Sequence, residues 1–294
     1  MNPALVTRLA DAGIIAPHHE PRPHERGPHS HVFTATAPDG TPLAVKVYRP
    51  ERPNRVATAA WAAQHLTGLG VPAPRVLFHD SQVCVQTWMS GIALPLLPPQ
   101  IQMDATRDAA QQLRRTHSLP MAGYGRLNEN GIGIHPTWRS WLLALPAGPT
   151  LHPVRSVLAE ASLRVDDDVH PHLLHGDWTA RHVLCTGATV TGIVDLDSAR
   201  AGDPMCDIAG WSLQEPAPLA RALAEGYFRT PPDLSTRLRL VLQRIRISAS
   251  LLGWHLDRGD TALARLRRDQ LHADLDDLAA GTLRTLPRVS PHPH

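Results

Sequence analysis

The pattern of apolar and polar positions differs between the first ninety residues and the rest of the chain. Short apolar runs bounded by turn residues predict four strands, at 32–37, 43–48, 76–78 and 83–88. Helical spacing appears at 4–15 and again at 55–66. The histidines near residues 18–31 alternate with prolines, which block a regular ligand geometry, so we expect a polar loop there rather than a metal tract. This region therefore predicts a small sheet with one packed helix.

Beyond Gly91 the spacing of apolar residues becomes helical. An amphipathic run covers 105–117, and a longer one covers 238–252. The only strands expected in this part are 183–185 and 190–194, which flank Gly187 and predict a short hairpin. The pattern favours an α+β protein with an N-terminal lobe at 1–89 and a mainly helical lobe at 90–294.

Composition excludes several classes of function. The chain has 294 residues, 43% of them hydrophobic and 19% charged, as in an ordinary globular protein. A net charge of +2 is too small to predict nucleic-acid binding. No run reaches the roughly 18 apolar residues of a membrane-spanning helix, and no secretory signal pattern opens the chain. The three cysteines lack paired or zinc-ligand spacing, so we expect a cytoplasmic protein; its oligomeric state stays open.

Three acidic motifs follow one another between residues 175 and 209. They are His175-Gly176-Asp177, then Val194-Asp195-Leu196-Asp197, then Gly202-Asp203-Pro204 with Asp207-Ile208-Ala209 behind it. The first offers a carboxylate in a rigid loop, and the second offers a carboxylate at the end of an apolar strand. Phosphoryl transfer uses one carboxylate to receive a hydroxyl proton and another to hold Mg²⁺ against nucleotide phosphates.

These motifs, in this order and at this spacing, resemble those of the aminoglycoside phosphotransferase and choline kinase-like family. The resemblance implies a two-lobed protein-kinase-like fold, Mg²⁺, and ATP or GTP as the phosphoryl donor. It also implies a hydroxylated small molecule as the acceptor. The family usually places Asn where this chain has His182, although its macrolide kinases also place His there.

The resemblance implies roles for the residues of these motifs. Asp177 is the expected catalytic base, and Asp195 the expected ligand of Mg²⁺. His182 is a softer ligand than Asn, and it could coordinate the metal, contact a phosphate as a cation, or hold a water that does. Arg181 could supply a cation at the γ-phosphate or be a solvated loop residue.

Other expected contacts lie in the first lobe. Lys46 interrupts an apolar strand, and a buried ammonium is costly unless it meets an anion, so we expect it to contact nucleotide phosphates. Ser30 lies in the segment that aligns with the phosphate-covering loop. The segment 86–89 is the expected hinge, where Gln86 and Trp88 would contact the base mainly through the backbone.

One expected part is missing from the chain. Kinases pair the strand lysine with a glutamate on the following helix. The matching position here is Ala59, and no acidic residue occurs from 56 to 71. Glu51 is the nearest acid and precedes the helix, so the lysine is positioned differently or the activity is reduced.

The acceptor is expected to be a hydroxylated antibiotic of the macrolide, nucleoside or aminoglycoside type. Asp274, Asp276 and Asp277 lie on a helix that reads as solvated, which favours a less cationic acceptor. Aromatic residues could line its pocket or belong to the core; they are Trp138, Trp141, Trp211, Tyr227 and Trp254. Two alternatives remain: a metabolic kinase for an amino alcohol or sugar, and an inactive nucleotide-binding protein.

Overall fold

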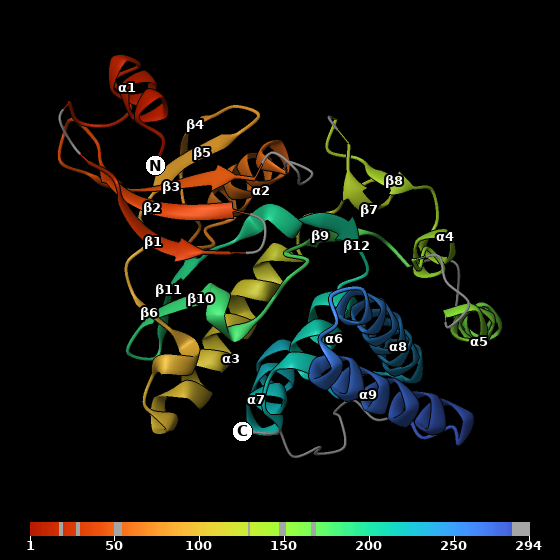
Figure 1. Cartoon of the computed structure of the whole chain (residues 1–294). Helices are drawn as coiled ribbons and strands as arrows, with labels where there is room; N and C mark the ends of the chain where they lie inside the picture. Colours follow the sequence, from red (N-terminus) through yellow and green to blue (C-terminus); the bar gives the residue numbers. More distant parts are fainter. Residues whose placement is uncertain are drawn as a thin grey trace.

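The computed structural model describes residues 1–17, 20–27, 30–49, 55–128, 130–146, 151–165 and 169–283. Its N-terminal part holds a five-stranded antiparallel sheet in the order β1-β2-β3-β5-β4 (Figure 1). The strands are β1 (Arg22–Arg26), β2 (Ser30–Thr36), β3 (Pro42–Tyr48), β4 (Val76–His79) and β5 (Val83–Thr87). Helix α1 (Pro3–Asp11) precedes the sheet, and α2 (Val56–Gly68) lies between β3 and β4.

Alternation along β3 decides which residues face the core and which face the second lobe. Leu43 and Val45 are fully buried with Val83, Val85 and Leu9 in one apolar cluster. Because successive side chains on a strand point to opposite faces, Lys46 and Tyr48 lie on the other face. Tyr48 packs there with Val56 of α2 and Cys84 of β5.

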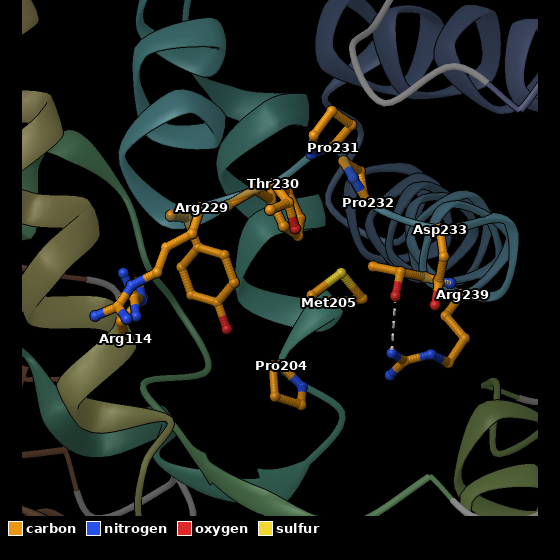
Figure 2. Close-up of a pocket in the computed structure, with 12 residues that line it drawn as sticks. Arg114, Pro204, Met205, Arg229, Thr230, Pro231, Pro232, Asp233 and Arg239 are labelled. Carbon is orange, nitrogen blue, oxygen red and sulfur yellow. Dashed lines mark hydrogen bonds between the residues drawn. The ribbon is translucent and has the colours of Figure 1, made fainter.

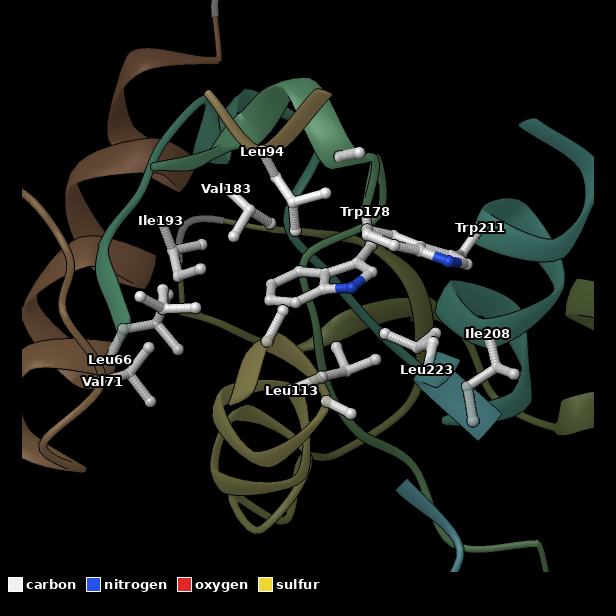
Figure 3. Packing of buried hydrophobic residues seen from close by; sticks show 14 of the residues in the cluster. Leu66, Val71, Leu94, Leu113, Trp178, Val183, Ile193, Ile208, Trp211 and Leu223 are labelled. Atoms are coloured by element: carbon white, nitrogen blue, oxygen red, sulfur yellow. The ribbon is translucent and has the colours of Figure 1, made fainter. Parts of the chain in front are cut away.

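The second part of the chain is mainly helical. Its helices are α3 (Pro99–Thr116), α4 (Trp138–Leu142), α5 (His152–Ser162), α6 (Met205–Gln214), α7 (Ala217–Tyr227), α8 (Leu234–Leu256) and α9 (Thr261–Ala279). Helices α8 and α9 run side by side (Figure 1). Figure 3 shows Trp178 at the centre of a cluster that includes Leu94, Leu113, Val183 and Leu223. This cluster joins α3, the hairpin strands and α7 beneath the loop that follows residue 174.

Short strands in the second part correct the expectation of a single hairpin. The hairpin forms as β10 (Val183–Thr186) and β11 (Thr189–Ile193), but β6 (Ile92–Ala93) adds a third strand to it. A four-stranded sheet in the order β8-β7-β12-β9 also forms, from Gly133–His135, Tyr124–Leu127, Arg200–Gly202 and His172–Leu174. These strands have two to four residues each, which is too short for an alternating pattern to be recognised.

Two further sequence expectations are wrong. The proline- and histidine-rich stretch, expected to be a polar loop, contains the strand β1. All side chains of β1 are exposed, so its sequence has no apolar alternation from which a strand could be predicted. Asp274 and Asp277 are buried rather than solvated, and Asp274 accepts hydrogen bonds from the guanidinium of Arg244 at 2.8–3.2 Å. A buried, paired carboxylate is unavailable to an acceptor, so these acids carry no information about its charge.

Most of the candidate pocket aromatics belong to the core. Trp138, Trp141 and Trp211 are buried, whereas Trp254 is 39% exposed on α8 and carries Arg258 over its ring. Across the described ranges, no helix combines the length and the apolar character needed to cross a membrane. The α+β, two-lobed architecture is confirmed: an antiparallel sheet in the N-terminal lobe and helices in the other.

Candidate active site

The loop after β9 carries the first acidic motif. Gly176 has φ of +79°, a conformation that glycine adopts without strain. The backbone N–H groups of His175 and Gly176 each donate to the carboxylate of Asp207, at 2.8 Å. His175 Nε2 donates to the carbonyl of Val194 at 3.0 Å, so the loop is also tied to the second motif. These bonds hold the backbone that carries Asp177 in one conformation.

Asp207 anchors this loop from the start of α6. It is 2% exposed and also lies 3.1 Å from His117 Nε2, while His117 Nδ1 lies 2.8 Å from the hydroxyl of Tyr227. Burial alone would raise the pKa of Asp207, but the bonds from His117 and the loop amides hold it below its ordinary value. Asp207 therefore stays ionised and keeps the loop in place.

Asp195 follows β11 and occupies an unusual backbone conformation. It has φ of 63°, and it is the only non-glycine residue with positive φ in the described ranges. Its Oδ1 lies 2.6 Å from Nζ of Lys46, and its Oδ2 lies 3.3 Å from Nε2 of His182. Burial would raise the pKa of Asp195, but the ammonium of Lys46 holds it well below its usual range.

His182 ends the 3₁₀ turn η3 (Ala180–His182) and faces both carboxylates. Its Nδ1 lies 2.9 Å from the carbonyl oxygen of Asp177, and a carbonyl only accepts, so Nδ1 carries the proton. Arg181 Nε donates to Nε2 at 3.1 Å, so the Nε2 lone pair accepts this hydrogen bond. Nε2 also lies 3.3 Å from Asp195 Oδ2, so this side of the ring faces the carboxylate.

Asp177, His182 and Asp195 together form a candidate cation site. One ligand atom from each lies within 4.8 Å of the others, and the side chains of Asp177 and Asp195 are 33% and 38% exposed. Carboxylate oxygens suit Mg²⁺, while an imidazole nitrogen suits softer divalent ions, so the donor set fits a divalent cation. Partial exposure leaves room for a ligand beside them.

Lys46 lies on the sheet side of this cluster. Its Nζ contacts Asp195 and, also at 2.6 Å, Oδ2 of Asp197. Burial would lower the pKa of Lys46, but the charges of Asp197 and Asp195 hold it above its ordinary value. The residue is therefore a fixed cation beside the two carboxylates.

The structure brings five of the predicted site residues together: Lys46, Asp177, Arg181, His182 and Asp195. Arg181 is mostly exposed, and its Nη2 lies 3.6 Å from Oδ2 of Asp177. Of the remaining three, Ser30 and Gln86 lie in the sheet and Trp88 follows β5. No hydrogen bond or ion pair found among the described residues joins them to the cluster.

The three outlying residues lie at or near the ends of the inner strands β2 and β5. Ser30 is buried at the start of β2, where its carbonyl accepts from Gly27 N–H at 2.9 Å; Pro28 and His29 lie outside the described residues. Gln86 pairs with Ala44 of β3, and the N–H of Trp88 donates to the Pro42 carbonyl at 2.9 Å.

Two contacts of the site were not predicted from the sequence: the one between Tyr48 and Asp197, and the one between His117 and Asp207. Tyr48 lies two residues after Lys46 on the same face of β3, and its hydroxyl donates to Oδ1 of Asp197 at 2.8 Å. Strand alternation is a signal that could have found Tyr48. Nothing in the sequence could have joined His117 to Asp207, because 90 residues separate them.

A separate pocket of about 470 Å³ lies between the end of α7 and the start of α8. Figure 2 shows Arg114 and Arg229 on one side of it and Arg239 on the other, with Met205 and Pro204 between. None of its lining residues belongs to the Asp177 cluster. The cluster therefore lies outside this pocket.

Comparison with known proteins gives the family. The model of the phosphotransferase enzyme family matches residues 20–241, which is most of the chain. The chain belongs to this family. The phosphotransferase is also 26% identical, over 236 residues, to hygromycin-B 4-O-kinase from Escherichia coli; the match covers 71% of this chain and 68% of that protein. The prediction of a phosphotransferase is thus confirmed.

Solved structures agree with the fold of the phosphotransferase. A thermostable mutant of aminoglycoside phosphotransferase APH(4)-Ia, in ternary complex with AMP-PNP and hygromycin B, superposes with a TM-score of 0.75 at 19% identity, covering 94% of this chain and 98% of that one. Macrolide 2'-phosphotransferase MphH from Brachybacterium faecium gives 0.61 at 18% identity, covering 94% and 98%. The kinase-like fold predicted from the motifs is confirmed.

Proposed function

We propose that this phosphotransferase moves the γ-phosphoryl group of ATP or GTP to a hydroxyl of an aminoglycoside-type antibiotic and so confers resistance. The observation that carries the proposal is the cluster of Asp177, His182 and Asp195, with Lys46 beside it. The kinship with hygromycin-B 4-O-kinase supports the acceptor class. The complex of APH(4)-Ia with AMP-PNP and hygromycin B supports a nucleotide donor.

Asp177 acts as the base in this proposal. Its carboxylate is held by the rigid loop and is 33% exposed, so an acceptor hydroxyl can reach it. It orients that hydroxyl and takes its proton as the new P–O bond forms, while the bond to the nucleoside diphosphate breaks. Arg181, which borders Asp177, places a cation where the transferred group gains negative charge.

Asp195 and His182 hold the divalent cation in this proposal, and Mg²⁺ is the ion expected in cells. A cation held there neutralises the charge of the nucleotide phosphates. Lys46 contacts the same phosphates from β3, and the backbone near Gln86 and Trp88 contacts the base. Ser30, at the base of the loop between β1 and β2, completes the contacts with the phosphates.

Two broader assignments accompany this function. We place the boundary between the lobes after residue 89, because the sheet ends with β5 at Thr87 and the helical part begins beyond it. We place the enzyme in the cytoplasm, because nucleoside triphosphates are available there and its three cysteines are free thiols.

Mass spectrometry of treated antibiotics tests the proposed function. The protein is incubated with Mg²⁺, ATP or GTP, and a panel containing hygromycin B, other aminoglycosides, macrolides, nucleoside antibiotics, choline and simple sugars. We expect one added phosphoryl group on an aminoglycoside and none with Asp177→Ala. Phosphorylation of a macrolide, choline or a sugar instead would reject the acceptor class but keep the reaction. Nucleotide binding without transfer to any acceptor would favour an inactive binder.

Replacing His182 with asparagine is expected to change metal preference rather than abolish activity. Asn offers a carbonyl oxygen, which suits Mg²⁺ better than an imidazole nitrogen does. We expect His182→Asn to keep or raise Mg²⁺-dependent turnover, and to raise the ratio of Mg²⁺- to Mn²⁺-supported turnover. Turnover assays with each ion and a Mn²⁺ titration followed by EPR measure this. A near-complete loss in a folded variant would show that the imidazole has its own chemistry.

A further inference from the structure

Lys46 is held by two carboxylates of one short segment. Asp195 and Asp197 both lie 2.6 Å from its Nζ, and the Lys46 side chain is only 12% exposed. A buried ammonium needs such partners, because removal from water is costly for an unpaired charge. The two carboxylates differ in their other contacts, and this difference separates their roles.

Asp195 also faces the candidate cation site. Its second oxygen lies 3.3 Å from His182 Nε2, within the cluster that fits a divalent ion. A carboxylate that binds a cation with one oxygen has less charge to offer an ammonium at the other. Asp195 alone is therefore a poor permanent partner for Lys46.

Asp197 is not one of the three residues of that cluster. Its Oδ2 contacts Lys46, while its Oδ1 accepts the hydrogen bond of the Tyr48 hydroxyl at 2.8 Å. Burial raises the pKa of Tyr48, so the phenol stays a neutral donor. The side chain of Asp197 is 18% exposed, and both of its oxygens are engaged by residues of β3.

Helix α2 offers no alternative partner. Its thirteen residues contain no acid, and Ala59 is buried at the position where kinases place the glutamate that pairs with the lysine. Glu51 lies outside the described residues. Helix α2 packs directly on the 3₁₀ turn η4 (Leu196–Ser198), which carries Asp197. The carboxylate thus comes from the turn beneath the helix instead of from the helix.

We propose that Asp197 is the positioning residue that replaces the missing helix glutamate. It holds the ammonium of Lys46 where it can contact nucleotide phosphates, and it leaves Asp195 for the cation. This inference rests on the proposed nucleotide site. It also explains how Lys46 is paired although helix α2 contains no acidic residue. The absence of that acid is then no longer an argument for an inactive protein.

A double-mutant cycle tests this role. The protein and its variants Asp197→Asn, Lys46→Met and the double variant are compared by calorimetric titration with ATP and Mg²⁺. Their steady-state kinetics are compared with hygromycin B or whichever acceptor the mass spectrometry finds. We expect Asp197→Asn to weaken nucleotide binding about tenfold and to lower kcat up to about 100-fold, because Lys46 is misplaced. In the Lys46→Met background the same change is expected to have no further effect. Asp276→Ala, an exposed acid on α9, is the matched control and should change nothing.

The outcomes separate this inference from the proposed function. If the loss of nucleotide affinity or kcat in the double variant equals the product of the losses in the two single variants, Asp197 acts independently of Lys46. That result would reject the positioning role. An effect of Lys46→Met without one of Asp197→Asn would reject it too, while the nucleotide site would stand. Wild-type protein that binds no nucleotide would reject both. Thermal unfolding of each variant identifies a change that merely unfolds the protein, and Tyr48→Phe then supplies the second test: it should weaken nucleotide binding only while Lys46 is present.

Discussion

Asp177→Asn is expected to lower kcat by about 100- to 10,000-fold, the range that a positioned general base contributes. The amide has the same shape as the carboxylate but cannot take the acceptor proton. Since the loop is held by Asp207 through the amides of His175 and Gly176, the substitution should leave its geometry unchanged. Single-turnover transfer, compared with calorimetric binding of ATP and Mg²⁺, measures chemistry apart from affinity.

The affinity measurement decides between two roles for Asp177. As the base, it contributes little to nucleotide binding, so the variant should bind ATP with Mg²⁺ as the wild type does. Asp177 also belongs to the candidate cation cluster with His182 and Asp195. Loss of binding together with turnover would assign it to the cation instead, and unchanged turnover would remove it from the reaction altogether.

Gly176→Ala is expected to destabilise the protein more than any other single added methyl group in the loop after β9. With φ of +79°, an L-residue is strained by about 1–2 kcal/mol. The new Cβ would also overlap the Ser198 carbonyl oxygen and lie 2.6 Å from Arg200 Nε. Adding an overpacking cost of about 1–3 kcal/mol gives a loss of about 3 kcal/mol in the free energy of unfolding. The midpoint of thermal unfolding should then fall by roughly 10 °C.

Gly187→Ala is the matched control for this change. Gly187 has a similar φ of +59° in the turn between β10 and β11, but no atom of the described residues would lie within 4 Å of a methyl group added there. Gly187→Ala therefore introduces the backbone strain without the collision. The midpoint of thermal unfolding of this variant should fall by roughly 3 °C, and its kcat should be unchanged. Equal effects of the two substitutions would show that the contact with Ser198 is unimportant.

Local sequence determined the parts of this protein that depend on neighbours along the chain. Short apolar runs bounded by turn residues predict β2, β3 and β5 to within two residues of their observed limits, because each strand is long enough for its apolar run to be recognised. The order and spacing of the acidic motifs from 175 to 209 also predict the family. They can do so because a carboxylate in a loop and a carboxylate at a strand end lie close together in the sequence.

Tertiary structure alone decided which charges meet. Lys46 and Asp195 are 149 residues apart, as are Tyr48 and Asp197, and no local pattern records these pairings. The strands of two to four residues in the helical lobe form because neighbouring segments pair with them, not because of their own composition. Asp274 looks solvated by sequence, yet it is buried because Arg244 of α8 neutralises it. Local composition thus sets which chemistry is available, and long-range packing sets which partner each charged group receives.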